Sequence, residues 1–247
     1  MRVGPSDDHA GRAGGPLALR YLVAAATLAA LAAGWSGAAT AASAVPRTQE
    51  VVTLHTSHAV RSAPHLSASS HRSIAARRPL TGAQTVLPVL GRAPGGWLRV
   101  RLPGRPNGAT GWIRARGTTV GFTPWHIVVD SAGRRVLVYR AGRVARTFRA
   151  VVGKASTPTP AGSFFVEEPV RLSPGDPGAP FALALSARSD VFQEFDGGPG
   201  QVALHGLANV GGVLGTAASH GCVRLAGDAM RWLVGRIGAG VPVTITR

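Results

Sequence analysis

Ser219-His220-Gly221-Cys222-Val223-Arg224-Leu225 is the stretch that decides how this chain is interpreted. It contains Cys222, the only cysteine of the 247 residues, two positions after a histidine. Upstream, Leu204-His205-Gly206 supplies a second histidine followed by glycine. A free thiol ionises only near pH ~8.5, so a reactive cysteine needs an imidazole that accepts its proton. The two segments therefore predict a Cys–His site with Cys222 as the nucleophile.

Two histidines compete for the role of base to this thiol. His220 is two positions from Cys222, and residues two apart in an extended strand point to the same side. A hairpin between His205 and Cys222 would instead bring the distant pair face to face. Gly221 lets the backbone bend so that neighbouring N–H groups converge on an oxyanion. The alternative is a buried, inert thiol beside structural histidines.

The sequence around these segments is typical of short strands joined by tight turns. Strands are expected at residues 125–129, 135–140, 144–152 and 164–166, and consecutive hairpins favour an antiparallel sheet. Met230, Leu233, Val234 and Ile237 form one apolar stripe and predict a helix, with Gly238 and Gly240 to end it. The expected fold is mainly β: an antiparallel, sandwich or barrel-like catalytic domain over residues 120–247 with one helix. The Pro- and Gly-rich residues 167–180 are expected to form a loop that acts as a lid.

A smaller β-module is predicted over residues 79–119. Trp97-Leu98-Arg99-Val100-Arg101-Leu102 alternates apolar and basic residues with the period of a half-buried strand. With Gly111-Trp112-Ile113, this run resembles bacterial Src-homology-3-like modules of wall proteins. The alternative is an ordinary hairpin packed on the next domain.

The first 44 residues of the chain point to export. Arg2, Arg12 and Arg20 precede an apolar stretch at residues 21–33, and small-residue cleavage sites follow at residues 39–44. Residues 1–44 therefore read as a signal peptide, with a retained membrane anchor as the alternative. Residues 45–78, rich in Ser, Ala, Arg and His, are expected to be a flexible linker without a metal site.

Charge and compartment together limit the partners. The chain has 27 Lys and Arg against 11 Asp and Glu, a formal net charge of +16, which favours anionic partners. An exported protein does not normally meet nucleic acid, so anionic wall polymers are the expected partners instead. A single cysteine excludes an internal disulfide.

Taken together, the motifs resemble the L,D-transpeptidase (YkuD) family over about residues 123–247. The Ser219–Cys222 core and the spaced His205-Gly206 carry the resemblance. Val152-Gly153-Lys154 and the run from Thr157 to Phe164 reinforce it. Arg224 departs from the Asn that many actinobacterial-type members carry at that position, which leaves the acceptor open.

The resemblance implies a role for each site residue. Cys222 matches the nucleophile and His205 the base, with the Gly206 carbonyl orienting its ring. His220, Gly221 and Cys222 match the turn that receives the oxyanion, and Ser219 supports it. Arg224 either grips a substrate carboxylate or forms an ion pair with Asp228.

The same resemblance implies an exported enzyme of the cell wall. It would cut a peptidoglycan tetrapeptide stem, release D-alanine and pass the acyl group to an amine of another stem. It needs no metal or organic cofactor, and carbapenem-type β-lactams are expected inhibitors. Two alternatives stay open: an L,D-carboxypeptidase that uses water as acceptor, and a non-catalytic protein that binds the wall.

Overall fold

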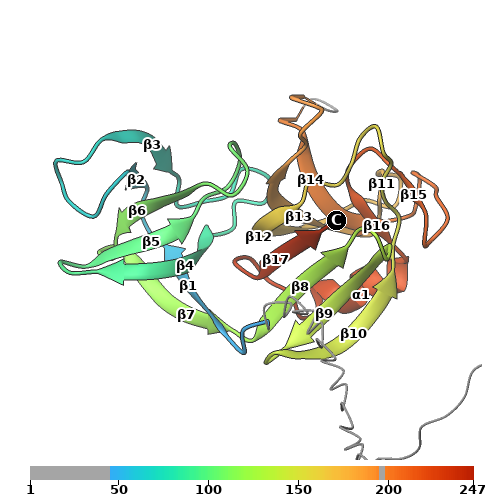
Figure 1. Ribbon diagram of the computed structural model, residues 1–247, viewed down its shortest axis with the longest axis horizontal. Helices are drawn as coiled ribbons and strands as arrows, with labels where there is room; N and C mark the ends of the chain where they lie inside the picture. The colour runs from blue at the N-terminus through green and yellow to red at the C-terminus, as the bar shows by residue number, and fades with distance from the viewer. Residues whose placement is uncertain (1–44, 195–197) are drawn as a thin grey trace, which may run out of the picture. The chain divides into compact units, whose positions relative to one another are not determined.

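The computed structural model describes residues 45–194 and 198–247 (Figure 1). The predicted signal peptide, and the alternative of an anchor, lie outside these residues. Within the described part, no helix has the length and apolarity needed to cross a membrane. The chain is mainly β, as predicted, with a single helix in the described residues.

The first sheet has seven strands in the order β3-β2-β6-β5-β4-β1-β7. Their bounds are β1 (Gln49–Leu54), β2 (His58–Arg61), β3 (Ser70–Ile74), β4 (Val86–Ala93), β5 (Trp97–Arg101), β6 (Thr110–Arg114) and β7 (Thr118–Thr123). The prediction of a flexible linker over residues 45–78 is wrong. These residues form three strands whose Val52, Leu54 and Ile74 are buried. These few apolar residues are enough, because Val52, Leu54, Val60 and Ile74 all face one core. The strands extend the β-module to residues 49–123, beyond the expected 79–119.

The second sheet has eight strands in the order β10-β9-β8-β17-β12-β13-β14-β16. Their bounds are β8 (Trp125–Asp130), β9 (Arg135–Arg140), β10 (Arg143–Arg149), β12 (Gly162–Arg171), β13 (Phe181–Arg188), β14 (Gln201–Gly206), β16 (Val223–Leu225) and β17 (Pro242–Thr246). Two further short strands, β11 (Val152–Gly153) and β15 (Ala217–Ser219), pair with each other.

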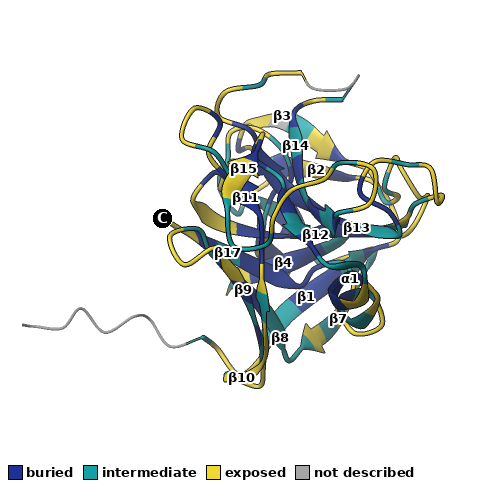
Figure 2. Ribbon diagram, turned by 90° about the vertical axis from the view of Figure 1, so that its right-hand side faces the viewer, coloured by how far each residue is buried: buried dark blue, intermediate teal, exposed yellow. Residues whose placement is uncertain are grey.

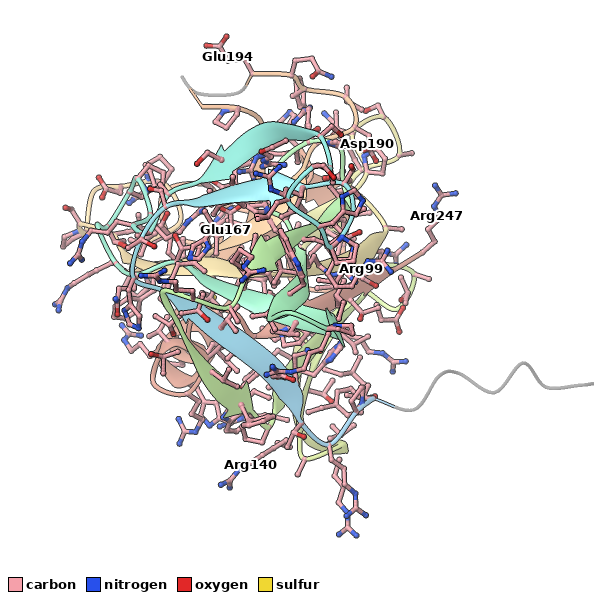
Figure 3. All side chains as sticks on the ribbon, turned by 90° about the vertical axis from the view of Figure 1, so that its left-hand side faces the viewer. Arg99, Arg140, Glu167, Asp190, Glu194 and Arg247 are labelled. Carbon is pink, nitrogen blue, oxygen red and sulfur yellow. The ribbon has the colours of Figure 1, made fainter. Side chains whose placement is uncertain are left out.

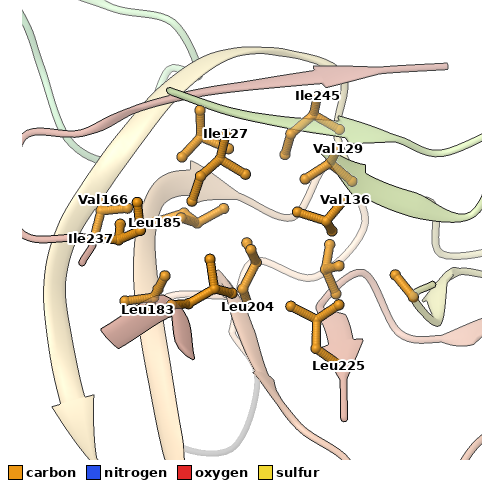
Figure 4. Packing of buried hydrophobic residues seen from close by; sticks show 14 of the residues in the cluster. Ile127, Val129, Val136, Val166, Leu183, Leu185, Leu204, Leu225, Ile237 and Ile245 are labelled. Atoms are coloured by element: carbon orange, nitrogen blue, oxygen red, sulfur yellow. The ribbon is translucent and has the colours of Figure 1, made fainter. Parts of the chain in front are cut away.

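Strand β12 joins the two halves of this sheet. Its first residues pair with β17 and its later residues with β13, with a register shift between Val166 and Glu168. The core lies between the two halves (Figure 4), where residues such as Ile127 and Val129 of β8 face Leu204 and Leu225 of β14 and β16. Buried residues accordingly concentrate on the central strands and exposed residues on the loops (Figure 2).

The hairpins predicted at β8–β9 and β9–β10 are confirmed. Gly133 donates its N–H to Asp130 Oδ1 at 2.7 Å in the first turn, and Ala141 and Gly142 adopt positive φ in the second. The sheet is nevertheless mixed, because β17 runs parallel to β8 and β14 runs parallel to β16. The expected loop at residues 167–180 is shorter than predicted, since β12 continues to Arg171.

The predicted helix is α1 (Gly227–Val234). Met230 and Leu233 are fully buried, and Asp228 lies in the first turn, where a negative charge suits the helix dipole. The helix ends earlier than expected: Gly235 is its C-cap and donates to the Arg231 carbonyl. Ile237 is therefore buried beyond the helix rather than on it.

The β-module and the second sheet share buried contacts. Phe165 of β12 is 1% exposed and belongs to the core of the first sheet. Glu167 of β12 is buried between two guanidinium groups, those of Arg78 and Arg188. Figure 3 shows Glu167 inside the fold, whereas Arg140 and Arg247 project outward. The module is therefore packed on the second sheet through both apolar and charged groups.

Candidate active site

Two parallel strands bring the cysteine and histidine segments together. In the β14–β16 pair, Leu204 lies opposite Val223 and His205 opposite Arg224. Leu204 and Val223 are fully buried in the core, so alternation places His205, Arg224 and, two positions earlier, Cys222 on the other face. The hairpin expected between His205 and Cys222 is thus wrong. The connection crosses over through β15, and the two segments meet as parallel neighbours.

These side chains line one cavity of about 420 Å³. Its walls come from the ends of β14 and β16, from the loop at residues 172–180 and from the segment after β13. The lining residues are Pro177, Ser189, Phe192, Gly200, Gln201, Val202, His205, Val210, His220, Cys222 and Arg224. Of the residues predicted from the sequence, the structure brings His205, His220, Cys222 and Arg224 to this cavity.

His205 is held in one tautomer by its neighbour. Its Nδ1 lies 2.8 Å from the Gly206 carbonyl oxygen, and because a carbonyl only accepts, Nδ1 carries the proton. The neutral ring then presents Nε2 as a proton acceptor. Burial lowers the pKa of His205, the Gly206 hydrogen bond partly opposes this, and the positive charge of Arg224 lowers it further. The ring is consequently neutral at neutral pH.

The loop at residues 172–180 packs directly on this histidine. Gly178, with φ of +84°, leaves no room for a side chain: a Cβ there would lie 2.8 Å from His205 Cγ. Gly178 donates its N–H to the Ala208 carbonyl at 2.7 Å, and Gly206 donates to the Gly178 carbonyl at 2.7 Å. The loop is therefore bonded to Gly206 and Ala208, directly after His205, and packs against its ring.

The surroundings of Cys222 favour the neutral form of its thiol. Burial raises its pKa, while a backbone hydrogen bond at Ala203 and the charge of Arg224 lower it to a smaller extent. A pre-formed thiolate–imidazolium pair is therefore not favoured. The arrangement suits a proton transfer that accompanies attack on a substrate.

The turn before Cys222 is built around Ser219. Its Oγ donates to the Cys222 carbonyl at 2.5 Å and accepts the N–H of Gly221 at 3.2 Å. Gly221 has φ of +123°, a conformation that side chains rarely adopt. The Ser219 carbonyl in turn accepts the N–H of Lys154 at 3.0 Å and the hydroxyl of Thr157 at 3.2 Å. These bonds give residues 154–157 a structural role beside the turn.

Arg224 is not paired with Asp228. Asp228 forms an ion pair with Arg231 at 2.8 Å and is exposed. Arg224 Nη1 instead donates to the carbonyls of Val210 and Gly211 at 3.1 and 3.2 Å. Its Nε is buried and has no hydrogen-bond partner among the described residues. Arg224 thus fixes the segment after β14 and places a positive charge beside the thiol and imidazole.

Sequence reasoning missed several walls of the cavity. Phe192 lies with its ring centroid 6.1 Å from that of His220, and Lys154 Nζ lies 3.5 Å from His220 Nε2. Lys154 is the only lysine of the chain, a signal that could have drawn attention to it. Phe192 sits in a segment without motif or periodicity, so nothing in the sequence marked it. Among the described residues, no cluster of His, Cys, Asp or Glu could hold a metal ion.

A thiol, a neutral imidazole and a bent turn in one cavity are the components of covalent acyl transfer through a thioester. The sequence matches the L,D-transpeptidase catalytic domain family (YkuD) over residues 124–245. A Bacillus subtilis (strain 168) protein, named as a candidate L,D-transpeptidase YkuD, is 30% identical over 124 residues, 50% of this chain and 67% of that protein. The chain therefore belongs to the L,D-transpeptidase (YkuD) family.

Solved structures of similar proteins carry related names. A mutant of the Enterococcus faecium L,D-transpeptidase is 23% identical, covering 49% of this chain and 49% of that one, with a TM-score of 0.39. L,D-transpeptidase 3 of Mycobacterium tuberculosis, in complex with a faropenem-derived adduct, is 15% identical. That match covers 66% of this chain and 91% of the other, with a TM-score of 0.43. The chain thus spans about half of the Enterococcus protein.

Proposed function

We propose that this protein is a peptidoglycan L,D-transpeptidase that moves an acyl group through a thioester on Cys222. The observation that carries the proposal is the register of β14 and β16. It puts the side chains of His205 and Cys222 on the same face, where both line one cavity. Family membership supplies the substrate class: a tetrapeptide stem as acyl donor and an amine of another stem as acceptor.

The first half-reaction forms the thioester. The Cys222 thiol transfers its proton to His205 Nε2 as sulfur attacks the carbonyl carbon of stem residue three. The oxyanion lies at the turn of residues 220–222, where Gly221 N–H is engaged by Ser219 and the Cys222 N–H is the proposed donor. The bond to D-alanine then breaks, and its nitrogen takes the proton from His205. An acyl group remains on Cys222.

The second half-reaction transfers this acyl group. The acceptor amine attacks the thioester carbonyl and gives a proton to His205, and the Cys222 thiolate leaves and is reprotonated. Water competes with the amine for the same thioester. Pro177 of the loop at residues 172–180 lines the cavity, and we propose that this loop, a shorter form of the expected lid, keeps water away.

The carboxypeptidase alternative uses the same groups with water as acceptor. Product analysis separates the two. Mass spectrometry of a purified disaccharide-tetrapeptide incubated with the protein should show loss of D-alanine together with a cross-linked dimer. Cys222→Ser, which keeps the shape of the side chain, should abolish both products. D-Alanine release without dimer supports the carboxypeptidase. Products that persist in Cys222→Ser contradict the thioester mechanism.

Carbapenem-type β-lactams are proposed to acylate Cys222, because the strained lactam carbonyl is an acyl donor for the same thiol. The faropenem-derived adduct of the Mycobacterium tuberculosis relative agrees with this expectation. Intact-mass analysis should show one covalent adduct on the wild type and none on Cys222→Ser. An unmodified wild-type mass after prolonged incubation contradicts the inhibitor proposal.

Export to the cell wall is also proposed, on the signal-like residues 1–44.

An anionic wall polymer is the second proposed partner. A surface pocket of about 510 Å³ on the β-module is lined by Arg61, Arg114 and Arg116, with Arg114 stacked over the Trp97 ring at 5.0 Å. Replacing Arg61 and Arg116 by Gln should weaken binding to a polyglycerol phosphate without changing D-alanine release. Unchanged polymer binding would count against this pocket.

A further inference from the structure

The turn between β5 and β6 (residues 102–109) reaches from the β-module to the segment that follows β13. This segment, described at residues 189–194 and 198–200, forms one wall of the candidate site. Arg105, in this turn, donates four hydrogen bonds to residues that follow β13. Its Nη2 donates to the carbonyls of Ser189 and Phe192, both at 2.8 Å. Its Nη1 donates to the Pro199 carbonyl at 3.2 Å, and its Nε to Gln193 Oε1 at 2.9 Å.

Asn107 of the same turn binds the start of this segment. Its Nδ2 donates to the Arg188 carbonyl at 2.7 Å and to Asp190 Oδ1 at 3.1 Å, and its Oδ1 accepts the Arg188 N–H at 2.8 Å. Gly104 adds a bond from its N–H to the Ser186 carbonyl at 3.2 Å. The turn therefore holds the end of β13, the residues directly after it and Pro199 just before β14.

The bound segment is part of the catalytic cavity. Ser189, Phe192 and Gly200 all line it, and the Phe192 ring lies beside the ring of His220. Packing here is tight: a Cβ on Gly200 would lie 3.2 Å from the Phe192 carbonyl carbon and 3.5 Å from Arg105 Nη2. A shift of the segment would therefore move this wall of the cavity, whereas His205 lies near the far end of β14 and Cys222 directly before β16.

The chemistry of these bonds makes Arg105 hard to replace. Three of its four acceptors are main-chain carbonyls, which a planar guanidinium with several fixed donors can satisfy together. Hydrogen bonds from a charged donor are stronger than neutral ones. A lysine at this position would keep the charge and reach fewer acceptors. Arg105 is therefore the side chain of the turn that joins Ser189, Phe192 and Pro199, while Asn107 holds the start of the segment at Arg188 and Asp190.

We propose that Arg105 is a positioning residue. Through its bonds to Ser189, Phe192 and Pro199, it fixes the position of the cavity wall that contacts the stem peptide. This rests on the proposed function for the identity of the substrate. It gives the module a part in substrate binding that is separate from any attachment to the wall.

The test compares Arg105→Ala, Arg105→Lys and Arg99→Ala in the full-length chain. Arg99 is the matched control, because it is an exposed module arginine that bonds Thr110 within its own sheet. Arg105→Ala should raise KM for D-alanine release about tenfold or more while kcat falls by less than about threefold. Arg105→Lys should have a KM between those of the wild type and Arg105→Ala. Arg99→Ala should have the KM and kcat of the wild type.

Two readouts do not depend on turnover. Amide hydrogen exchange of residues 189–194 should accelerate at least about tenfold in Arg105→Ala, whereas exchange in β14 stays unchanged. The rate of iodoacetamide modification of Cys222 should change by less than about threefold, since the thiol and its base are not touched. Exchange equal to the wild type overturns the positioning role, as does an equal KM change in Arg99→Ala.

Failure of the proposed function gives a different pattern. A wild-type protein that releases no D-alanine contradicts the transpeptidase proposal, while accelerated exchange in Arg105→Ala still supports the positioning of the segment. Accelerated exchange with an unchanged KM in an active enzyme overturns the link to substrate binding.

Discussion

Nδ1 of His205 donates its proton to the carbonyl oxygen of Gly206 at 2.8 Å, so Nε2 of the neutral ring is the atom that can accept a proton. This bond is formed within one dipeptide and needs no distant partner. It makes the His-Gly pair, rather than the histidine alone, the unit that prepares the proposed base.

Replacing His205 by Ala should lower the rate of Cys222 acylation by about 10²–10⁴-fold, the usual contribution of a general base. The measurement is single-turnover acylation by a carbapenem, followed by intact mass. His65→Ala is the control, because His65 is an exposed residue of the β-module whose ring contacts Ser67. An acylation rate within threefold of the wild type would remove His205 from the mechanism.

Modification of Cys222 by iodoacetamide should rise steadily with pH. Burial raises the pKa of this thiol, so the thiolate is scarce at neutral pH and increases as pH rises toward that pKa. A plateau that already begins at acidic pH would instead indicate a pre-formed thiolate–imidazolium pair. The reaction is followed by mass spectrometry over a pH series.

Arg224→Gln should shift two titrations to higher pH. The positive charge of Arg224 lowers the pKa of both Cys222 and His205, so its removal raises both. The thiol modification curve should move to more alkaline pH, and the acidic limb of kcat/KM should also move up, because His205 must be neutral to act as base. Arg231→Gln, at an exposed arginine paired with Asp228, should move neither curve.

Gly178→Ala should reduce activity far more than Gly175→Ala. A Cβ at position 178 would overlap the His205 ring, and the backbone there has a positive φ that alanine rarely adopts. A Cβ at position 175 would have no atom within 4 Å. We expect kcat to fall about 10²-fold or more in the first variant, since a small displacement of a catalytic group is costly. Equal kinetics for the two variants would show that the loop does not fix the ring.

Ser219→Ala should destabilise the turn before Cys222. It leaves the buried N–H of Gly221 without its acceptor, which costs about 1–3 kcal/mol of unfolding free energy. Thermal or urea unfolding measures this loss. Ser131→Ala is the comparison, because the Ser131 hydroxyl is buried without a partner among the described residues and its loss should cost little. A Ser219→Ala protein as stable as the Ser131→Ala protein contradicts the role given to this hydroxyl.

Local patterns predicted much of the second sheet. The alternation of Arg135–Arg140 and the Ala141-Gly142 turn each depend on neighbouring residues only, and both are confirmed. The parallel pairing of β14 with β16 is decided by distant strands that enclose the core, so the sequence favoured a hairpin instead. The same applies to residues 45–78, where a few apolar side chains form strands because the partners β4, β6 and β7 lie far along the chain.

The same reason explains why only some of the residues of the site were predicted. Cys222, His205 and His220 stand in short motifs, and the structure brings all three to one cavity. Phe192 and Ser189 reach it from a segment without motif, held by bonds from Arg105, which lies more than eighty residues away in sequence. Contacts between distant segments leave no local pattern to read.

Phe165 lies in the core of the first sheet although it belongs to a strand of the second. Translation proceeds from the N-terminus, so all seven strands of the β-module are synthesised before this side chain is made. Until Phe165 is made, the core of the module lacks the phenyl ring that completes its packing. The core of the first half of the chain is therefore completed only after the second half has begun to be made, and until then the nascent module exposes apolar surface.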